Sequence, residues 1–141
     1  MILLDSDHLT VLGYLDDPKC SALTARLEQV GDPSIATTII SFEEQMRGWM
    51  AEIHRQRDIH RQTTYYARLG KMIEFFKRWT IVPFASNAAD QFLRLRKDRV
   101  RIGAQDLKIA SIALVHDALL LSANLRDYRK VPGLKVENWF V

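Results

Sequence analysis

The chain has 141 residues, 48% of them hydrophobic and 26% charged, which suffices for one buried core in a single domain spanning 1–141. No apolar run approaches the roughly 18 residues of a membrane span. No basic segment precedes the first apolar stretch, so we expect a cytoplasmic protein with neither a membrane span nor a signal peptide. Its one cysteine, Cys20, excludes an internal disulfide and a cysteine metal cluster, and we expect it to be buried or half-buried.

Charge is unevenly distributed, although the net charge is only +3. Residues 45–100 contain 12 Lys/Arg against 5 Asp/Glu, a balance of +7, whereas the rest contains 8 against 12, a balance of −4. A basic middle with acidic flanks suits a protein that meets a polyanion with one face and holds a cation with another. Helices with Lys and Arg on their solvated faces give the same excess, so charge alone leaves nucleic-acid binding open.

Strand-like and helix-like segments alternate along the chain. The strand candidates are short, apolar and rich in Ile, Leu, Val and Thr, which is typical of strands buried on both faces. The helix candidates carry apolar residues at helical spacing. In chain order the prediction is strand 2–4, helices 6–15 and 18–30, strand 34–38, helices 41–60 and 63–79, strand 80–82, helices 86–100 and 105–115, and strands 118–122 and 134–137.

This alternation predicts an α/β fold, with a central parallel sheet of about five short strands and helices on both of its faces. Helices 41–60 and 63–79 follow one another without an intervening strand, so we expect them to form a helical arm. In such folds ligands bind at the carboxyl ends of the strands, and the crossover helices begin at that same edge.

Acidic residues recur at this predicted edge. They stand just after a strand or near a helix start: Asp5, Asp7, Glu43, Glu44, Asp106 and Asp127. Carboxylate oxygens are the ligands that Mg²⁺ and Mn²⁺ prefer. Carboxylates that cluster repel one another unless a cation neutralises them. A divalent metal site at the carboxyl edge is therefore the simplest interpretation.

Each acid also has a structural interpretation, and the sequence leaves these open. Glu44 fits the last position of an S-x-x-E capping box, and Asp106 fits a favourable charge at a helix start. Asp127 fits an exposed turn within SANLRDY, and Asp7 is better explained as an exposed helix-start acid than as a metal ligand. Asp5 is the hardest to explain structurally, because it abuts the apolar strand without a local partner.

Other chemistries find little support in the sequence. The histidines lack the spacing of a zinc site, and we expect all four to be surface or packing residues: His8, His54, His60 and His116. The glycines form no phosphate-binding loop. No Ser or Cys stands in a recognisable arrangement with a base, so nucleophilic catalysis has no support.

Four segments resemble the motifs of PIN-domain nucleases, and in particular of VapC-type toxins. LLDSD resembles the opening LLDT[N/S] of that family, and SFEEQMRG resembles its second acidic segment. IGAQDLKIASIAL resembles the third motif, and LLLSANLRDYRKVPGLKVENW resembles the C-terminal ending. The resemblance covers both ends of the chain and the region around Glu44, whereas residues 51–100 show little of it.

The resemblance implies a three-layer α/β/α PIN-like fold and a Mg²⁺- or Mn²⁺-dependent endoribonuclease, the toxin of a type II toxin–antitoxin pair. Its acidic positions fall on Asp5, Glu44, Asp106 and Asp127, which would be the catalytic and metal-binding residues. Asn124 takes the polar position before the last acid, and it stays open whether Asn124 or Asp127 contacts the metal. Family analogy further implies a cognate antitoxin, an RNA substrate and a homodimer.

Neighbouring residues take supporting roles in this interpretation. Ser6 and Ser122 would orient the metal ligands from behind. Arg126, Arg129 and Lys130 lie beside the predicted metal edge and are the best candidates for contact with RNA phosphates. Other basic residues could follow the RNA backbone: Arg47, Arg55, Arg57, Arg61, Arg94, Arg96, Lys97, Arg99 and Arg101. The departures from the family pattern are Ser6 for Thr, Asp7 for Asn and Tyr128 for Phe.

Two rival functions are compatible with parts of the sequence. LLDSDHLT mimics the D-x-D opening of haloacid-dehalogenase-like phosphatases, in which Asp5 would be the nucleophile and Asp7 the general acid/base. That class also needs a downstream Lys and an acidic pair, and only isolated acids at Asp117 and Asp127 are available. The second rival is a non-catalytic RNA- or protein-binding module that kept the fold. All four acidic positions of the family are filled in this chain, which argues against a loss of activity.

Overall fold

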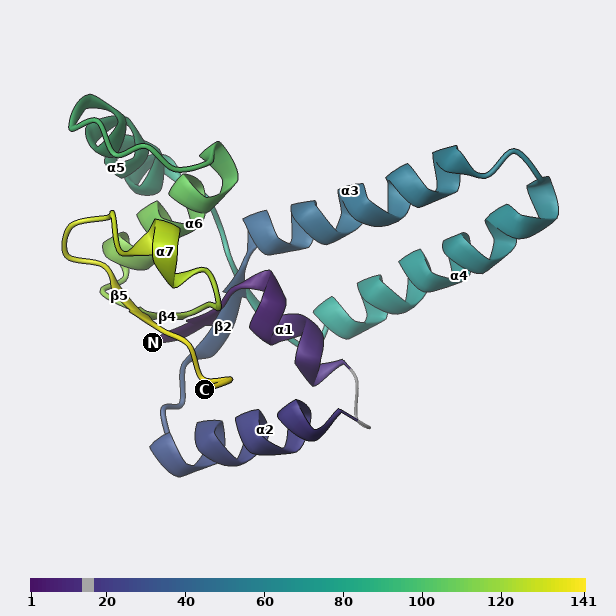
Figure 1. Cartoon of the computed structure of the whole chain (residues 1–141), viewed down its shortest axis with the longest axis horizontal. Helices are drawn as coiled ribbons and strands as arrows, with labels where there is room; N and C mark the ends of the chain where they lie inside the picture. The colour runs from purple at the N-terminus through teal and green to yellow at the C-terminus, as the bar shows by residue number, and fades with distance from the viewer. Residues whose placement is uncertain (14–16) are drawn as a thin grey trace.

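The computed structural model describes residues 1–13 and 17–141 (Figure 1). Its elements in chain order are β1 (Ile2–Leu4), α1 (Ser6–Leu12), α2 (Pro18–Val30), β2 (Ile35–Thr38), α3 (Ile39–Arg55), α4 (Ile59–Phe76), β3 (Thr80–Val82), α5 (Ser86–Lys97), α6 (Ala104–Val115), β4 (Leu119–Leu121), α7 (Leu125–Tyr128) and β5 (Lys135–Glu137). No helix among these residues is both long and apolar enough to span a membrane. Cys20 is buried, as expected.

The five strands form one parallel sheet in the order β3-β2-β1-β4-β5. The first strand is central, and Leu3 stands in register with Ala36 of β2 and Leu120 of β4. The chain builds the sheet from β1 toward β3 on one side and then returns to add β4 and β5 on the other. The strand order therefore reverses between β1 and β4, which is where ligands bind in open α/β sheets.

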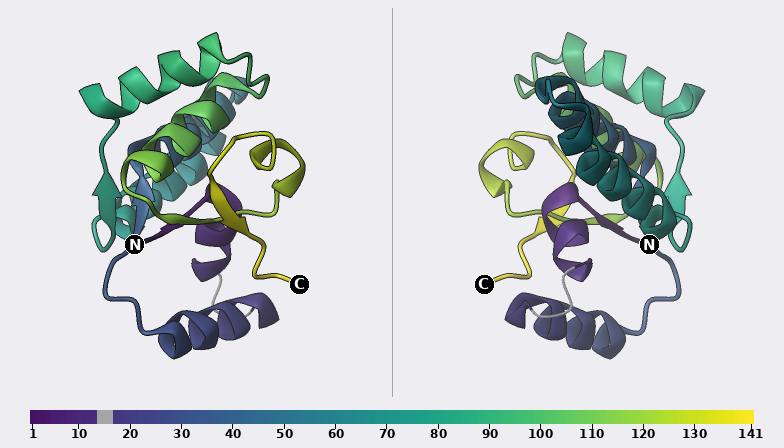
Figure 2. Two further views of the ribbon diagram at one scale, coloured as in Figure 1. Left: turned by 90° about the vertical axis from the view of Figure 1, so that its left-hand side faces the viewer. Right: turned by 90° about the vertical axis from the view of Figure 1, so that its right-hand side faces the viewer.

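Helices cover both faces of the sheet, which confirms the predicted three-layer arrangement. Alternate residues of a strand point to opposite faces, so Leu3 and Leu120 pack with α5 and α6 on one side. Ile2 and Leu4 pack on the other side, against α1, α2 and α4. Figure 2 shows the sheet edge-on, with α5 and α6 on one side and α1 and α2 on the other.

The predicted helical arm is present, but its turn lies earlier than the sequence suggested. Helices α3 and α4 run side by side away from the sheet (Figure 1). Helix α4 begins at Ile59 rather than near residue 63, because Asp58 caps it by accepting a hydrogen bond from the His60 N–H at 2.8 Å. Gln62 then closes the turn by donating to the carbonyls of Ile53 and Gln56.

Two structural alternatives that the sequence left open do not hold, and one predicted helix falls partly outside the described residues. Thr38, not Ser41, caps α3, since its hydroxyl accepts from the Ser41 N–H at 3.2 Å. Glu44 therefore lies in the second turn and is no capping residue. The segment read as a turn before residue 128 contains the short helix α7. Helix 6–15 is confirmed as far as Leu12, and residues 14 and 15 of that prediction lie outside the described part of the chain.

Candidate active site

The predicted acids come from four elements that meet at the carboxyl edge of the sheet. Asp5 follows β1 directly, and Glu44 lies in α3. Asp106 lies in the first turn of α6, and Asp127 lies in α7. Side-chain hydrogen bonds join them in two groups, with Asp5 and Glu44 in one and Asp106 and Asp127 in the other.

The first group is organised by two serines. Asp5 is buried, with 7% of its surface exposed. Its Oδ1 accepts from the Ser6 N–H at 2.8 Å, and its Oδ2 accepts from the Ser122 hydroxyl at 2.8 Å. The Ser6 hydroxyl donates to Glu44 Oε2 at 3.0 Å, so this serine connects both carboxylates. Ser122 follows β4, and its bond to Asp5 spans the point where the strand order reverses.

The second group is organised by an amide and a phenol. The Asn124 amide donates to Asp106 Oδ2 at 3.2 Å and to Asp127 Oδ2 at 3.3 Å. The Tyr128 hydroxyl donates to Asp106 Oδ1 at 3.3 Å. Tyr128 is fully buried, and burial raises its pKa far above the usual value, so the phenol stays protonated and can only be neutral there. In the sequence Tyr128 stands out only as a departure from the Phe of the family pattern, which does not predict its hydrogen bond to Asp106.

Burial and mutual repulsion raise the pKa of Asp5, Glu44 and Asp106. Burial is the main cause for Asp5, and the charges of Asp7 and Asp106 add to it. Burial also raises the pKa of Glu44, with the charges of Asp5 and Asp106 adding to it. Burial and the charge of Asp127 raise the pKa of Asp106. The two groups therefore sense each other's charge and form one negatively charged region.

The region fits a divalent cation by the chemistry of its oxygen donors. Within the described residues, Asp5, Glu44 and Asp106 have no cationic partner at ion-pair distance, and Asp127 has only Lys130, with Nζ 3.6 Å from Oδ1. Across residues 1–13 and 17–141, however, no three Asp, Glu, His or Cys side chains converge closely enough to hold one ion together. The acids are gathered into one region, but not into a preformed ligand cage.

Glu43 shows what a purely structural acid looks like in this fold. Its Oε2 pairs with Arg47 Nη2 at 2.8 Å, and its Oε1 accepts from the Gln105 amide at 2.8 Å. The hydrogen bond from Gln105 lowers the pKa of Glu43, in contrast to the raised pKa of Glu44 beside it. The structure thus separates two adjacent acids that the sequence pattern could not rank.

Asp7 is not the exposed helix-start acid that the sequence suggested. It is half-buried, and its Oδ2 accepts from the Ala123 N–H at 2.8 Å and from the Ser122 hydroxyl at 3.4 Å. Its Oδ1 accepts from His8 Nδ1 at 2.7 Å. Burial alone would raise the pKa of Asp7, but the hydrogen bonds from His8 and Ala123 outweigh it and lower that pKa. Asp7 therefore ties α1 to the residues after β4 as a stable anion.

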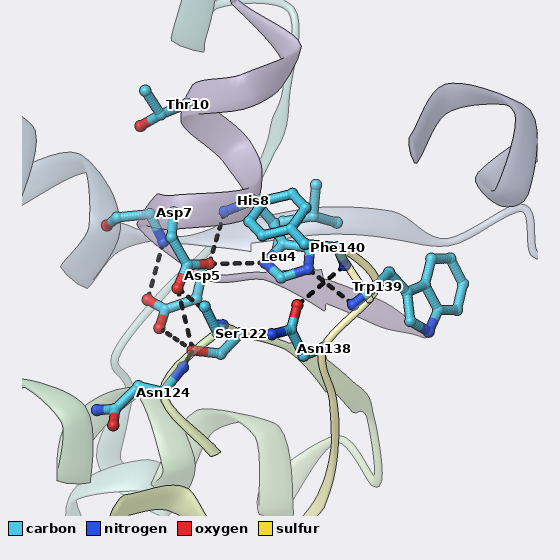
Figure 3. Close-up of polar contacts among 12 residues, drawn as sticks. Leu4, Asp5, Asp7, His8, Thr10, Ser122, Asn124, Asn138, Trp139 and Phe140 are labelled. Carbon is cyan, nitrogen blue, oxygen red and sulfur yellow. Dashed lines mark hydrogen bonds and ion pairs between the residues drawn. The ribbon is translucent and has the colours of Figure 1, made fainter. Parts of the chain in front are cut away.

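His8 is a packing residue, as expected, but it also has two specific hydrogen bonds (Figure 3). It is fully buried, and its ring stacks on Phe140 with centroids 3.9 Å apart. Its Nε2 accepts from the Trp139 N–H at 3.1 Å. A backbone N–H can only donate, so the proton of the ring is on Nδ1, where it faces Asp7. His8 thus joins the C-terminal segment to Asp7.

The predicted phosphate contacts and a further group of arginines lie around this region. Arg126 and Arg129 are exposed, whereas Lys130 is partly engaged with Asp127. A hollow of about 650 Å³ next to Asp127 is lined instead by residues from the end of α5 to the start of α6, among them three arginines. The sequence suggests these arginines as part of a longer set of basic residues that could follow an RNA backbone, but it does not predict that they surround one hollow.

Known proteins match about half of this chain in sequence and the whole of it in structure. No protein-family model matches the chain. Ribonuclease VapC1 from Rickettsia felis is 36% identical over 69 residues, 45% of this chain and 52% of that protein. Ribonuclease VapC2 from Haemophilus influenzae is 34% identical over 70 residues, 47% of this chain and 53% of that protein. The match thus spans about half the length of these curated relatives.

Solved structures match over the whole chain at lower identity. A chain of VapBC-1 from nontypeable Haemophilus influenzae has a TM-score of 0.72 at 18% identity, covering 100% of both chains. A chain of VapBC2 from Rickettsia felis, solved with a fragment of promoter DNA, has a TM-score of 0.67 at 21% identity, covering 99% of both. The chain therefore has the PIN-like fold found in VapBC toxin–antitoxin structures, and half of it is similar in sequence to ribonucleases named VapC.

Proposed function

We propose that this protein is a divalent-metal-dependent endoribonuclease that acts as the toxin of a type II toxin–antitoxin pair. The observation that carries the proposal is the set of Asp5, Glu44, Asp106 and Asp127, brought from four elements to the carboxyl edge of the sheet and linked by neutral donors. The similarity to ribonucleases named VapC supports the same activity.

The carboxylates would hold Mg²⁺ or Mn²⁺, the ions that carboxylate oxygens favour. Asp5 and Asp106 would be direct ligands, and Asp127 with Asn124 would complete a second, weaker site. Such an ion, when bound, lowers the pKa of a coordinated water and offsets negative charge on the attacked phosphate. Ser6 and Ser122 would keep Asp5 and Glu44 oriented, since they already donate to these carboxylates.

Glu44 is the residue best suited to accept the proton of the attacking water. Among residues 1–13 and 17–141, Ser6 engages Glu44 Oε2 and no side chain engages Oε1, which leaves Oε1 for the water. Burial and neighbouring charges raise its pKa toward the range in which a carboxylate is an effective general base. Arg126, Arg129 and Lys130 would contact the RNA backbone, and single-stranded regions are the expected target because A-form helices hide their bases.

The phosphatase rival fits the structure poorly. It needs Asp7 to deliver a proton to the leaving group, yet Asp7 is held as an anion by His8 and the Ala123 N–H, which lower its pKa. The non-catalytic rival is disfavoured by the raised pKa of three acids that lack cationic partners within the described residues. A pure binding module has no use for such destabilising charges.

A cognate antitoxin and a second copy of this chain are the proposed protein partners, in the cytoplasm. The structural neighbours include a toxin–antitoxin complex from Klebsiella pneumoniae. A hollow of about 550 Å³ between α1, α3 and α4 is lined by Trp49, Met72 and Phe75, together with polar residues. An amphipathic antitoxin helix could place its apolar face there.

The test is cleavage of a panel of RNAs by purified, partner-free protein with Mg²⁺, with Mn²⁺ and with chelator. We expect internal cuts that need the metal and disappear in Asp5→Asn and Asp106→Asn. An Asp7→Asn variant should retain weakened cleavage, whereas a phosphatase would lose activity altogether. Cleavage that persists in chelator, or no cleavage of any RNA, would contradict the proposal.

A further inference from the structure

The hollow beside Asp127 lies where α5 ends and α6 begins. Arg96, Arg99 and Arg101 line it together with Gly103. Asp127 forms part of the same wall and is linked through Asn124 to Asp106. The hollow therefore borders the carboxylate region at Asp127.

The arginines of the hollow have no carboxylate partners within the described chain. Of the ion pairs that residues 1–13 and 17–141 form, none includes Arg96, Arg99 or Arg101. Arg96 only stacks over Phe92, at 4.9 Å from its guanidinium carbon to the ring centroid. Three guanidinium groups and the single carboxylate of Asp127 line one concave surface, so the hollow carries an excess of positive charge that attracts anions.

The backbone at Arg99 indicates that this side chain is not there for stability. Helix α5 ends in a Schellman motif, in which the Arg99 N–H donates to the Arg96 carbonyl and the Val100 N–H donates to the Leu95 carbonyl. Arg99 occupies the left-handed position of this motif, with φ of 61°. That position favours glycine, and a side chain with a Cβ is strained in it.

The end of α6 provides an internal comparison. It uses the same pair of hydrogen bonds, from Asp117 and Ala118, and Asp117 has φ of 48°. Aspartate is among the residues that tolerate this conformation, whereas arginine is not. The chain thus places a cation at a strained position on the wall of a cationic hollow, which is the pattern of a residue kept for binding.

We propose that the arginine-lined hollow binds a backbone phosphate of the RNA strand next to the phosphate that is cleaved. This inference rests on the proposed function, because it takes the cleaved phosphate to lie at the carboxylates. A strand so placed carries another phosphate one nucleotide away, and the hollow borders the carboxylates at Asp127. Guanidinium groups bind phosphate oxygens through paired hydrogen bonds, which suits Arg99 and Arg101 to this role.

An acidic protein segment is the competing ligand for a basic hollow. Its carboxylates have no chemical reason to extend from the hollow into a region that is itself rich in carboxylates. An RNA strand has such a reason, since its next phosphate would be the one attacked. The observations therefore favour RNA, and the acidic segment becomes an outcome of the test.

The test measures binding of fluorescein-labelled single-stranded dodecauridylate in chelator, where the proposed function predicts no cleavage. For Arg99→Gly we expect the affinity to fall about tenfold and the slope of log affinity against log salt to fall by about 0.7. The melting temperature should rise by about 3 °C, because glycine relieves the strained backbone. Weaker binding by a more stable protein cannot come from misfolding.

Arg101→Gln serves as a second variant and should weaken binding to a similar extent. Lys19→Gln is the control, because it removes one exposed charge on α2, which lies on the other side of the sheet from α5 (Figure 2). The control should change affinity less than twofold. The proposal would be overturned if the unchanged protein did not bind dodecauridylate, or if the Arg99 and Arg101 variants bound it as tightly as the unchanged protein does. A loss of affinity in the control as large as that in the two variants would also overturn it.

A labelled decaglutamate peptide distinguishes the competing ligand. Binding of this peptide that depends on Arg99, without binding of dodecauridylate, would assign the hollow to a protein partner and overturn the proposal. The outcome of the metal-dependent cleavage assay is independent of the outcome of this binding assay. If the protein cuts RNA but the arginine variants bind normally, only the hollow is misassigned; if it binds through Arg99 but cuts no RNA, only the proposed function is wrong.

Discussion

At the scale of single residues, Glu44 and Glu43 are neighbours in α3 with opposite surroundings. Glu44 is half-buried among other acids, and Glu43 is paired with Arg47 and Gln105. We expect Glu44→Gln to reduce RNA cleavage at least 100-fold, because it removes the proposed general base without changing the size of the side chain. The rate of cleavage at saturating metal and RNA measures this.

Glu43→Gln is the control for that substitution. It should leave cleavage within a few-fold of the unchanged protein, since the polar partners of Glu43 are Arg47 of α3 and Gln105 of α6, neither of which belongs to the carboxylate region. Equal losses in the two variants would show that the position along α3, and not the chemistry of Glu44, matters.

His8 supports a different prediction, for stability. In His8→Phe the ring can still stack on Phe140, but the Trp139 N–H loses its acceptor and Asp7 loses a donor. A buried donor left unsatisfied costs about 1–3 kcal/mol. We therefore expect the free energy of unfolding in urea to fall by about 2–3 kcal/mol. The control His116→Phe, at an exposed position, should change the free energy of unfolding by less than about 0.5 kcal/mol. An equally small change in His8→Phe would show that the hydrogen bonds of His8 do not stabilise the protein.

At the scale of elements, the start of α3 shows where the sequence pattern misleads. Ile39 and Ile40 are β-branched and follow an apolar strand, so the helix seemed to begin at Ser41. The structure begins it at Ile39, because the extended Thr38 supplies the cap. Strands Ile2–Leu4 and Thr80–Val82 were predicted with their observed bounds, since uninterrupted apolar runs mark such strands. The four-residue α7 was missed because it is too short to show a helical period.

The cap of α3 can be tested by substitution of Thr38. Thr38→Ala removes the hydroxyl that accepts from the Ser41 N–H, and we expect it to lower the free energy of unfolding by about 1–2 kcal/mol. Thr38→Ser keeps the oxygen and should recover most of that loss. If the serine variant were as unstable as the alanine variant, the lost methyl group would explain the effect instead of the cap. Urea unfolding of the three proteins distinguishes these outcomes.

At the scale of the whole molecule, the strand order decides which acids meet. The sequence places acids after strands and at helix starts, and this predicts the edge on which they gather. It does not contain the order β3-β2-β1-β4-β5, which brings Asp5 next to Ser122 and so joins the two ends of the chain. For the same reason the bonds of Tyr128, the role of His8 and the arginine-lined hollow could not be predicted, because each depends on contacts between distant segments.

The charged region also predicts how stability depends on pH without metal. Burial and neighbouring charges raise the pKa of Glu44 above its ordinary value of 4.5, so the native protein holds a proton there that the unfolded chain has already lost. Glu44 therefore lowers stability increasingly as pH rises through this window. In chelator, Glu44→Gln should be more stable than the unchanged protein at pH 7, and this advantage should shrink as pH falls toward 4.5.

Thermal melting of the two proteins across that pH range measures the advantage. The comparison cancels the contribution of Asp7, whose pKa is lowered and whose stabilisation is lost only as pH falls below its ordinary value of 3.8. An advantage that is absent at pH 7, or that grows toward low pH, would show that Glu44 is not in a repulsive environment.

The most direct test of a metal-binding carboxylate region is calorimetric titration of Mn²⁺ into the purified protein. We predict saturable binding to the unchanged protein and at least tenfold weaker binding to Asp5→Asn and Asp106→Asn. Asp90→Asn, which removes an exposed acid on α5, should bind as the unchanged protein does. Absence of saturable binding, or equal binding by all four proteins, would contradict the account.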